Sequence, residues 1–283
     1  MRAAQFHITL FGPLFLKKAP LRQLSPRLSQ LSNWVEHSEP YDAIWDLCCD
    51  HGLLGLHLYQ NQTQSHIYLV DRVTSIIERL NHRIDAKSHE RLTALHSNAE
   101  NIQLSWGSQK EPRQKPRQLI ILAGLGGESI IHILRGIVAS NAETMRNANI
   151  EFLLSANSHS YELRQYLRES NCRLINEVFV VDNGWSHEHM HIAWQHNQCK
   201  QPTVPVSELG IKIWHPWDAA RQAYLSGILT HLENQTRYSP DTYSAEKLKA
   251  YKTLEITLNS TPHARTHEYS ASTSELFSPR VQA

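Results

Sequence analysis

Between residues 41 and 194, short apolar runs alternate with longer segments in which apolar residues recur at helical spacing. Such alternation is typical of strand and helix units built on a mostly parallel sheet. The pattern therefore predicts an α/β fold. The expected strands are residues 43–48, 67–70, 92–96, 119–123 and 152–155, and the expected helices are residues 53–59, 73–86, 128–139 and 161–170.

The end of this region predicts a β-hairpin. Residues 174–181 and 190–194 flank Asp182-Asn183-Gly184, and Asn and Gly tolerate the positive φ angles of a tight turn. Five parallel strands that close with an antiparallel hairpin are the order expected of a class I methyltransferase sheet, a Rossmann-like arrangement.

A helical appendage is expected after a linker. The periodicity stops over residues 195–210, and apolar residues then recur at helical spacing over 217–232 and 248–258. Ser239-Pro240-Asp241 breaks the run, so these segments predict a helical hairpin or a short coiled coil. The expected domains are an N-terminal extension (1–22), a Rossmann-like domain (23–198), a helical C-terminal domain (199–260) and a disordered tail (261–283).

Composition limits the partners and the cellular compartment that we expect for the protein. The 28 basic and 27 acidic residues of the 283-residue chain leave a formal net charge of +1, so a nucleic acid would have to be held by a local patch. The four cysteines form no CxxC pair, which favours a reduced, cytoplasmic protein without structural zinc. The apolar stretch 6–16 is interrupted by Gly12 and Pro13 and is too short to span a bilayer, so no membrane association is expected.

Candidate binding residues follow the ends of the expected strands, where ligands gather in an open parallel sheet. Residues 46–52 contain two acids and a histidine, and Asp71 ends the second strand, where a carboxylate can take both hydroxyls of a ribose. Asn98 follows the third strand. Three of the 11 glycines come after the fourth strand, where a ligand or another backbone approaches closely. They are Gly124, Gly126 and Gly127.

Each of these features has a structural alternative. Asp46 and Asp71 could cap helices or turns, His51 could cap or pack, and the glycine loop could be a tight turn only. Three histidines alternate along one expected strand and so share a face, which together with Glu188 raises a metal site as an alternative. They are His187, His189 and His191. We expect no metal, because the sequence identifies no further ligand.

Together these motifs resemble the bacterial tRNA (adenine(22)-N1)-methyltransferases, S-adenosylmethionine enzymes with a Rossmann-like domain and a C-terminal coiled coil. The resemblance covers roughly residues 24–258. It is carried by residues 24–28, 46–52, 98, 123–127, 163–167, 188 and 208–210. It implies an enzyme that methylates N1 of an adenine in tRNA at position 22, with S-adenosylmethionine as cofactor and tRNA as partner.

The resemblance also implies roles for individual residues. Catalysis is expected from Asp50 and His51. The cofactor-binding residues would be Asp46, Gly52, Asp71, Asn98, Gly124, Gly126 and Gly127, with Asp71 at the ribose and Asn98 at the adenine. The substrate-binding residues would be Arg27, Asn157, His159 and Glu188. The sequence leaves the oligomeric state open.

The expected reaction depends on alignment and desolvation more than on a strong base, because a ring nitrogen attacks the methyl group of a sulfonium. Asp50 would accept a hydrogen bond from the exocyclic amino group and stabilise the positively charged product. The target edge is hidden within a base pair, so the nucleotide must be unpaired or flipped, with Trp185 or His159 stacking on it.

The sequence departs from the family pattern in three places. Cys48 stands where the family usually has glycine, residues 156–159 replace a polar stretch, and Ser186-His187 replaces an aromatic pair. The last two changes fall on the expected substrate side, so another RNA or DNA adenine, or a small molecule, is an alternative target. From a different class, the alternative is a non-catalytic RNA-binding protein on the same fold.

Overall fold

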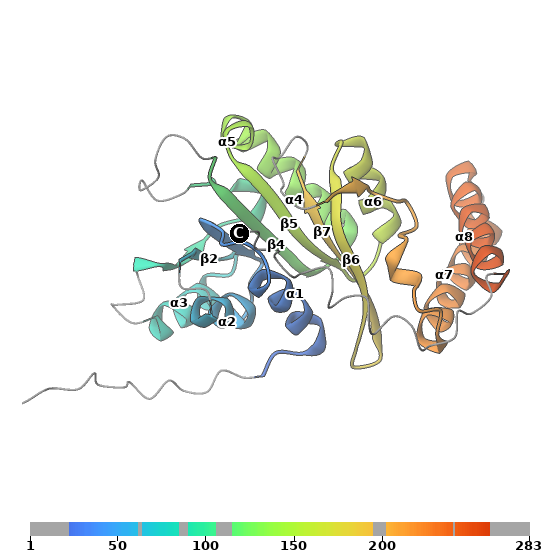
Figure 1. Ribbon diagram of the computed structural model, residues 1–283, viewed down its shortest axis with the longest axis horizontal. Helices are drawn as coiled ribbons and strands as arrows, with labels where there is room; N and C mark the ends of the chain where they lie inside the picture. The colour runs from blue at the N-terminus through green and yellow to red at the C-terminus, as the bar shows by residue number, and fades with distance from the viewer. Residues whose placement is uncertain are drawn as a thin grey trace, which may run out of the picture.

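The computed structural model of the protein describes residues 23–61, 64–84, 90–105, 115–194, 202–239 and 241–260. The expected extension 1–22 and tail 261–283 lie outside the described residues. An eight-stranded sheet forms the centre, in the order β3-β2-β1-β4-β5-β7-β6-β8 (Figure 1). Its strands are β1 (Ala43–Leu47), β2 (His66–Asp71), β3 (Leu92–His96), β4 (Arg117–Leu125), β5 (Asn149–Ala156), β6 (Arg173–Asp182), β7 (Trp185–Ala193) and β8 (Val204–Pro205).

Strands β1 to β5 are parallel, and β7 lies antiparallel between β5 and β6. The predicted α/β fold with a Rossmann-like sheet is therefore confirmed. Every residue of β1 is buried, including Asp46. Each predicted parallel strand is present within a few residues of its expected bounds, because a strand covered on both faces requires a nearly continuous apolar run.

Helices cover both faces of the sheet. One face carries α1 (Pro26–Glu36), α2 (Leu53–Asn61) and α3 (Thr74–Arg83), and the other carries α4 (Gly127–Ser140), α5 (Ala142–Asn147) and α6 (Ser160–Glu169). Each layer has its own apolar core, with Leu31 and Leu80 in the first and Ile130 and Leu163 in the second. Helix α1 is absent from the predicted helices. It begins at Pro26, a position where the missing N–H group costs nothing.

The β6–β7 hairpin is longer than the sequence predicts. Asn183 and Gly184 have φ angles of 50° and 79°, and β7 begins directly after them at Trp185 instead of at residue 190. Two consecutive positive φ angles make a two-residue turn, so pairing starts at once. Because Ala156 at the end of β5 pairs with Glu188, the first three residues of β7 extend beyond β5.

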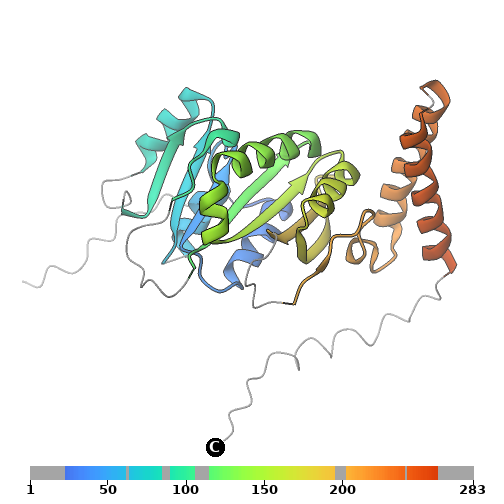
Figure 2. The ribbon, with the colours of Figure 1, turned by 90° about the horizontal axis from the view of Figure 1, so that it is seen from above.

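Two antiparallel helices, α7 (Ala219–Tyr238) and α8 (Thr242–Ser260), lie beyond the β6 side of the sheet (Figures 1 and 2). They confirm the predicted helical hairpin. Asp218 caps α7 by accepting a hydrogen bond from the Arg221 N–H at 3.0 Å. Strand β8 pairs with β6, so the sheet extends into the segment that the sequence assigns to the helical domain. Among the described helices, none has the length and apolar character needed to cross a bilayer.

Candidate active site

The carboxyl ends of β1 to β5 meet at one edge of the sheet, because these strands are parallel. The loops that follow them carry most of the residues predicted as a site. Residues 48–52 follow β1, Asp71 ends β2, Asn98 follows β3, residues 124–127 lie at the end of β4 and residues 157–159 follow β5. This carboxyl edge is the place where ligands bind in open α/β sheets.

Asp46 is the most deeply placed acid of the edge. Its Oδ2 accepts a hydrogen bond from the Gly55 N–H at 2.9 Å, near the start of α2. A side chain at Gly55 would collide with Leu69 and approach Asp46, so glycine is what lets helix and strand come together. Burial raises the pKa of Asp46 to about 7, although the Gly55 N–H group lowers it. A cationic group beside this carboxyl would therefore restore its charge.

Asp71 connects the loop after β1 with the loop after β2. Its Oδ2 accepts from the Asp50 N–H at 3.0 Å, and its Oδ1 accepts from the Val73 N–H at 2.9 Å. Each carboxylate oxygen can accept a second hydrogen bond. Asp71 thus combines the capping role that the sequence left open with remaining capacity for the hydroxyls of a ligand.

The loop after β1 has an unusual backbone. Cys48, Asp50 and Gly52 all have positive φ angles, of 54°, 48° and 64°. At Gly52 the space is also restricted, because an added Cβ would lie 2.8 Å from Leu80. Cys48 thus adopts a conformation that glycine favours, at the position where the related family has glycine. Burial and the neighbouring acids raise the pKa of the Cys48 thiol to about 11, so it stays protonated and is a poor nucleophile.

Asp50 and His51 project from the edge into solvent. Their side chains are 69% and 62% exposed, and His51 Nε2 lies 3.8 Å from Asp50 Oδ1. The carbonyl oxygen of His51 accepts a hydrogen bond from Arg83 Nη1 at 3.3 Å, which fixes the loop to α3. Asn98 is also exposed, at the start of the short 3-10 helix η2 (Ala99–Asn101). These three side chains are accessible to a ligand at the edge.

The glycine loop after β4 is shaped by the loop after β5. The Gly127 N–H donates to the Ser158 carbonyl at 2.8 Å, and a Cβ on Gly127 would lie 2.2 Å from the His159 carbonyl oxygen. A Cβ on Gly124 would lie 3.1 Å from Arg27 Nη1. Close approach of protein groups therefore explains why Gly124 and Gly127 have no side chain, and the expectation that the glycine loop also binds the cofactor stays a prediction. Asn157 joins the same contact, since its N–H donates to the Leu125 carbonyl at 2.8 Å.

Glu188 is not brought to the carboxyl-edge loops. It is buried, its Oε2 accepts from Arg164 Nε at 3.0 Å, and its Oε1 accepts from Tyr224 Oη at 2.9 Å. Arg164 also pairs with Glu177, whose Oε1 accepts from the N–H groups of Ile211 and Lys212. These contacts hold α6, the hairpin and α7 together. Two of its hydrogen bonds are thus made inside the fold, so Glu188 is not among the substrate contacts proposed below, and its expected contact with substrate stays a prediction.

The sequence missed a cluster of buried polar atoms beneath α1. Arg27 Nη1, Ser155 Oγ, His187 Nδ1 and both ring nitrogens of His189 are buried without a hydrogen-bond partner. The alternating histidines are the signal that could have revealed it, and the sequence offered a metal site as their alternative meaning. Glu188 lies on the opposite face of β7 from them, and among the described residues no group of three potential ligands could hold a metal.

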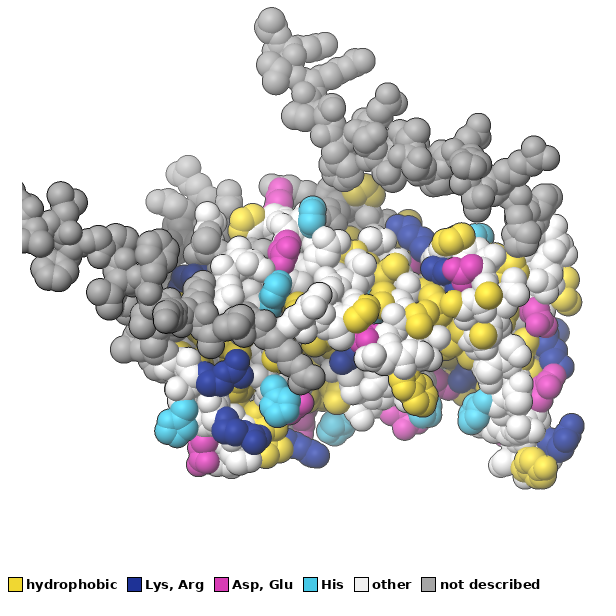
Figure 3. Space-filling model, turned by 90° about the horizontal axis from the view of Figure 1, so that it is seen from below, with side chains coloured by type: hydrophobic (Ala, Val, Ile, Leu, Met, Phe, Trp, Pro, Cys, Tyr) yellow, Lys and Arg dark blue, Asp and Glu magenta, His cyan; other side chains and the backbone are white. Residues whose placement is uncertain are grey.

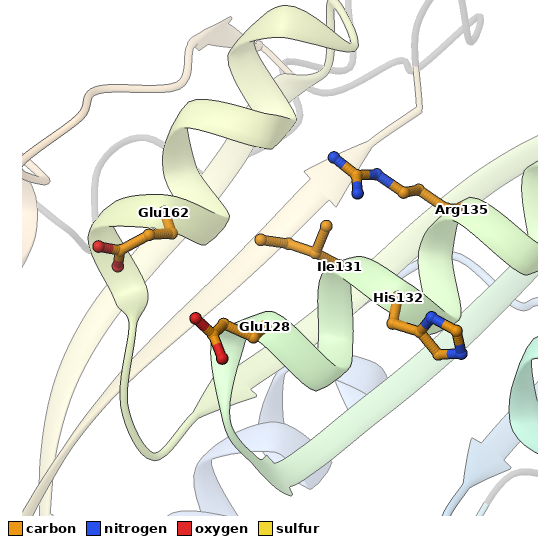
Figure 4. Close-up of a pocket in the computed structure, with 5 residues that line it drawn as sticks. All are labelled: Glu128, Ile131, His132, Arg135 and Glu162. Atoms are coloured by element: carbon orange, nitrogen blue, oxygen red, sulfur yellow. The ribbon is translucent and has the colours of Figure 1, made fainter. Parts of the chain in front are cut away.

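The described surface carries charges of both signs. Figure 3 shows acidic, basic and histidine side chains intermixed on the face seen from below, without one large basic field over the described residues. A separate hollow of about 280 Å³ lies between α4 and α6. Figure 4 shows its lining, with Glu128 and Glu162 facing it from the two helices and His132 pointing away. None of the sequence-predicted site residues line this hollow.

The strand order, with acids at the ends of β1 and β2, defines a Rossmann-like protein of the methyltransferase class. A family model described as a methyltransferase domain matches residues 24–190. The chain therefore belongs to the methyltransferase-domain family. No curated protein matches the sequence.

Solved structures share this fold over almost their whole length. TrmK of M. capricolum, solved with the cofactor product S-adenosyl-homocysteine, is 16% identical with a TM-score of 0.60, and the match covers 84% of this chain and 99% of that one. The m1A22 tRNA methyltransferase TrmK of B. subtilis is 17% identical with a TM-score of 0.57, and the match covers 84% and 97%. At these identities the similarity is one of fold.

Proposed function

We propose that this protein transfers a methyl group from S-adenosylmethionine to N1 of an adenine in tRNA, at position 22. The observation that carries the proposal is the fold match to the solved TrmK proteins, one described as an m1A22 tRNA methyltransferase, over 97–99% of their chains. The family model of a methyltransferase domain matches only residues 24–190, whereas the fold match to the TrmK structures covers 84% of this chain. The unpaired thiols of the three described cysteines agree with action in the reducing cytoplasm.

The donor set of the carboxyl edge fits this cofactor. S-adenosylmethionine supplies an electrophilic methyl group on a sulfonium, together with an amino group, a ribose and an adenine. Asp46 offers a buried carboxyl whose charge an amino group would restore, and Asp71 keeps acceptor capacity for ribose hydroxyls. The residues proposed to bind it are Asp46, Gly52, Asp71, Asn98, Gly124, Gly126 and Gly127.

Asp50 and His51 are the proposed catalytic pair. Asp50 would accept a hydrogen bond from the exocyclic amino group of the adenine and would stabilise the positive charge that methylation leaves on the ring. Its N–H group is held by Asp71, so the loop fixes Asp50 relative to the cofactor side of the edge. His51, 3.8 Å from the Asp50 carboxylate, would orient it.

Arg27, Asn157 and His159 are the proposed substrate contacts. Arg27 lies against Gly124, and the other two follow β5, so all three flank the β4 end of the edge. His159 has a φ of 55° and precedes α6, and its Nδ1 lies 3.0 Å from Ser158 Oγ. Because the surface charge is mixed, tRNA would be held by such local groups and not by a broad positive field.

The test is to incubate the protein with labelled S-adenosylmethionine and an unmodified tRNA transcript, followed by nucleoside mass spectrometry. We expect 1-methyladenosine, and none from a matched transcript with guanine at position 22. N6-methyladenosine or methylated cytidine would contradict the target. Calorimetric titration with S-adenosylmethionine separates the non-catalytic alternative, since absence of binding would support an RNA-binding protein on this fold.

A further inference from the structure

One face of β7 carries a row of side chains that passes from solvent into the protein. Trp185, His187 and His189 alternate along the strand and therefore share the face turned toward α1. Trp185 is 74% exposed, His187 is half-buried and His189 is 0% exposed. The first three residues of β7 lie beyond the end of β5, an overhang of about 10 Å past the carboxyl edge.

The inner part of this row contains hydrogen-bonding groups that the protein does not use. Neither ring nitrogen of His189 has a partner, nor has Nδ1 of His187. Ser155 lies directly opposite His189 in the β5–β7 register, and its buried Oγ also has no hydrogen-bond partner. Buried polar atoms are paired in the great majority of cases, so these four atoms are hydrogen-bonding capacity that the described protein groups leave unused.

Arg27 adds a positive charge beside the row. It extends from α1, its Nη1 is buried without a partner, and the guanidinium lies against Gly124 of the glycine loop. The charges of Arg27 and Asp182 act on the same histidines. Asp182 pairs with Trp185 across the hairpin, and its Oδ1 accepts from Asn183 Nδ2. Burial and Arg27 lower the pKa of His187, which keeps its ring neutral and able to donate one hydrogen bond.

The chemistry of this face matches a nucleotide better than a protein partner. A docking surface for a protein would be a continuous apolar patch, whereas the neighbours of Trp185 on its face are Asp182 and His187. The exposed indole of Trp185 and the guanidinium of Arg27 both lie near Asp182, and together they offer a stacking platform and a hydrogen-bond donor for a phosphate. The overhang also places the indole beside the edge where the adenine is proposed to react.

We propose that this hairpin face is a nucleotide subsite for the RNA substrate, in which Trp185 stacks on an unpaired base while Arg27 and His187 donate hydrogen bonds to its phosphate. The inference rests on the proposed function and deepens it. It also separates the two stacking candidates, because His159 Nδ1 is already within hydrogen-bond distance of Ser158 Oγ and its Nε2 lies 3.9 Å from Glu128.

The experiment compares Trp185→Ala with Trp185→Phe and with Tyr238→Ala. Tyr238, 80% exposed at the end of α7, is a matched exposed aromatic distant from the hairpin. Steady-state methylation of tRNA and calorimetry with S-adenosylmethionine are measured for each. We expect Trp185→Ala to raise KM for tRNA by about tenfold with cofactor affinity unchanged, Trp185→Phe to recover most of this, and Tyr238→Ala to behave as wild type.

A second measurement tests the phosphate contact. The logarithm of tRNA affinity is plotted against the logarithm of salt concentration. Arg27→Gln should reduce the magnitude of the slope by about one, as expected for the loss of one phosphate contact. If wild type methylates tRNA and Trp185→Ala leaves KM unchanged, the subsite is overturned and the proposed function stands. If wild type does not methylate RNA, both are overturned. A change in self-association of Trp185→Ala without a change in KM would assign the face to a protein contact and contradict the subsite.

Discussion

Neighbouring buried residues on the two faces of β7 differ in their hydrogen bonding. Glu188 is 2% exposed and accepts hydrogen bonds from Arg164 and Tyr224, whereas His189 is 0% exposed and neither of its ring nitrogens has a hydrogen-bond partner. The first face joins the sheet to α6 and α7, and the second faces α1. Adjacent positions in a strand point to opposite sides, so one step along the chain separates a structural group from an unused one.

This difference has an energetic meaning. A buried polar group without a partner costs about 1–3 kcal/mol relative to one that is hydrogen-bonded. The paired face recovers that cost inside the fold, through Arg164, Glu177 and Tyr224. On the other face His191 pairs with Glu151, whereas His189, His187 Nδ1 and Ser155 Oγ have no hydrogen-bond partner, and we assign this outer, unpaired part of the face to a ligand. Variants on the two faces should therefore affect different measurements.

The largest expected effect is the acid sensitivity of the unpaired face. Burial, followed by His187 and Arg27, lowers the pKa of His189 from 6.5 to about 3. Between pH 6.5 and 3 the His189 ring is protonated in the unfolded state but not in the folded state. The free energy of unfolding is therefore highest above pH 6.5 and decreases as the pH falls toward 3. The loss is up to about 5 kcal/mol. Urea unfolding of wild type and His189→Leu at pH 7.5, 5.5 and 4.5 measures it, and equal slopes for the two would contradict the assignment.

The paired face should respond next most strongly. Glu188→Gln leaves Arg164 with one acidic partner in a buried site, and breaking such a pair costs about 3 kcal/mol or more. We expect a lower midpoint of thermal unfolding and an unchanged KM for tRNA at temperatures where the variant is folded. His189→Leu at pH 7.5 is the control, since it removes no hydrogen bond or ion pair and replaces the ring that packs on Trp34 by another apolar side chain. A raised KM with unchanged stability for Glu188→Gln would return Glu188 to the substrate site.

The contrast between the faces also shows what the sequence could and could not predict. The parallel strands, the Asn183-Gly184 turn and the two C-terminal helices depend on local periodicity and turn chemistry, so the sequence predicts them. The side of the sheet on which Glu188 lies depends on register, and its partners come from residues 24 and 36 positions away. No local pattern contains that information.

Some features of the candidate site can likewise be predicted from the sequence, and others cannot. The acids at the ends of β1 and β2 are predictable because parallel strands bring their carboxyl ends together. The contact of Arg27 with Gly124 is not, because it requires α1 to fold across the sheet, and α1 itself is missing from the predicted helices. The alternating histidines are visible in the sequence, but only the structure shows that His191 pairs with Glu151 while the ring nitrogens of His189 have no hydrogen-bond partner.

The loop after β1 repeats the contrast, since the Asp71 carboxylate accepts hydrogen bonds from two N–H groups, while the Asp50 carboxylate is exposed and has only His51 near it, at 3.8 Å. If free groups serve the ligand, Asp50→Ala should lower kcat by about 100-fold and leave cofactor affinity intact. Single-turnover methyl transfer and calorimetry measure the two quantities. Glu143→Ala, an exposed carboxylate on α5, is the control. Turnover of Asp50→Ala equal to that control would remove Asp50 from the mechanism.

The smallest effect tests whether this loop keeps a backbone suited to glycine. Cys48 has a φ of 54°, a left-handed conformation that costs a residue with a Cβ about 1 kcal/mol or more, whereas the neighbouring Cys49 is not left-handed. Cys48→Gly removes that cost, but it also loses partly buried packing and gives the unfolded chain more freedom, so we expect stability to stay within about 0.5 kcal/mol of wild type. Cys49→Gly has no strain to relieve and loses partly buried packing, so it should cost about 1 kcal/mol. Urea unfolding of both variants decides the point, because both lose partly buried packing and only Cys48→Gly also relieves a left-handed backbone. Equal losses at the two positions would show that Cys48 is unstrained.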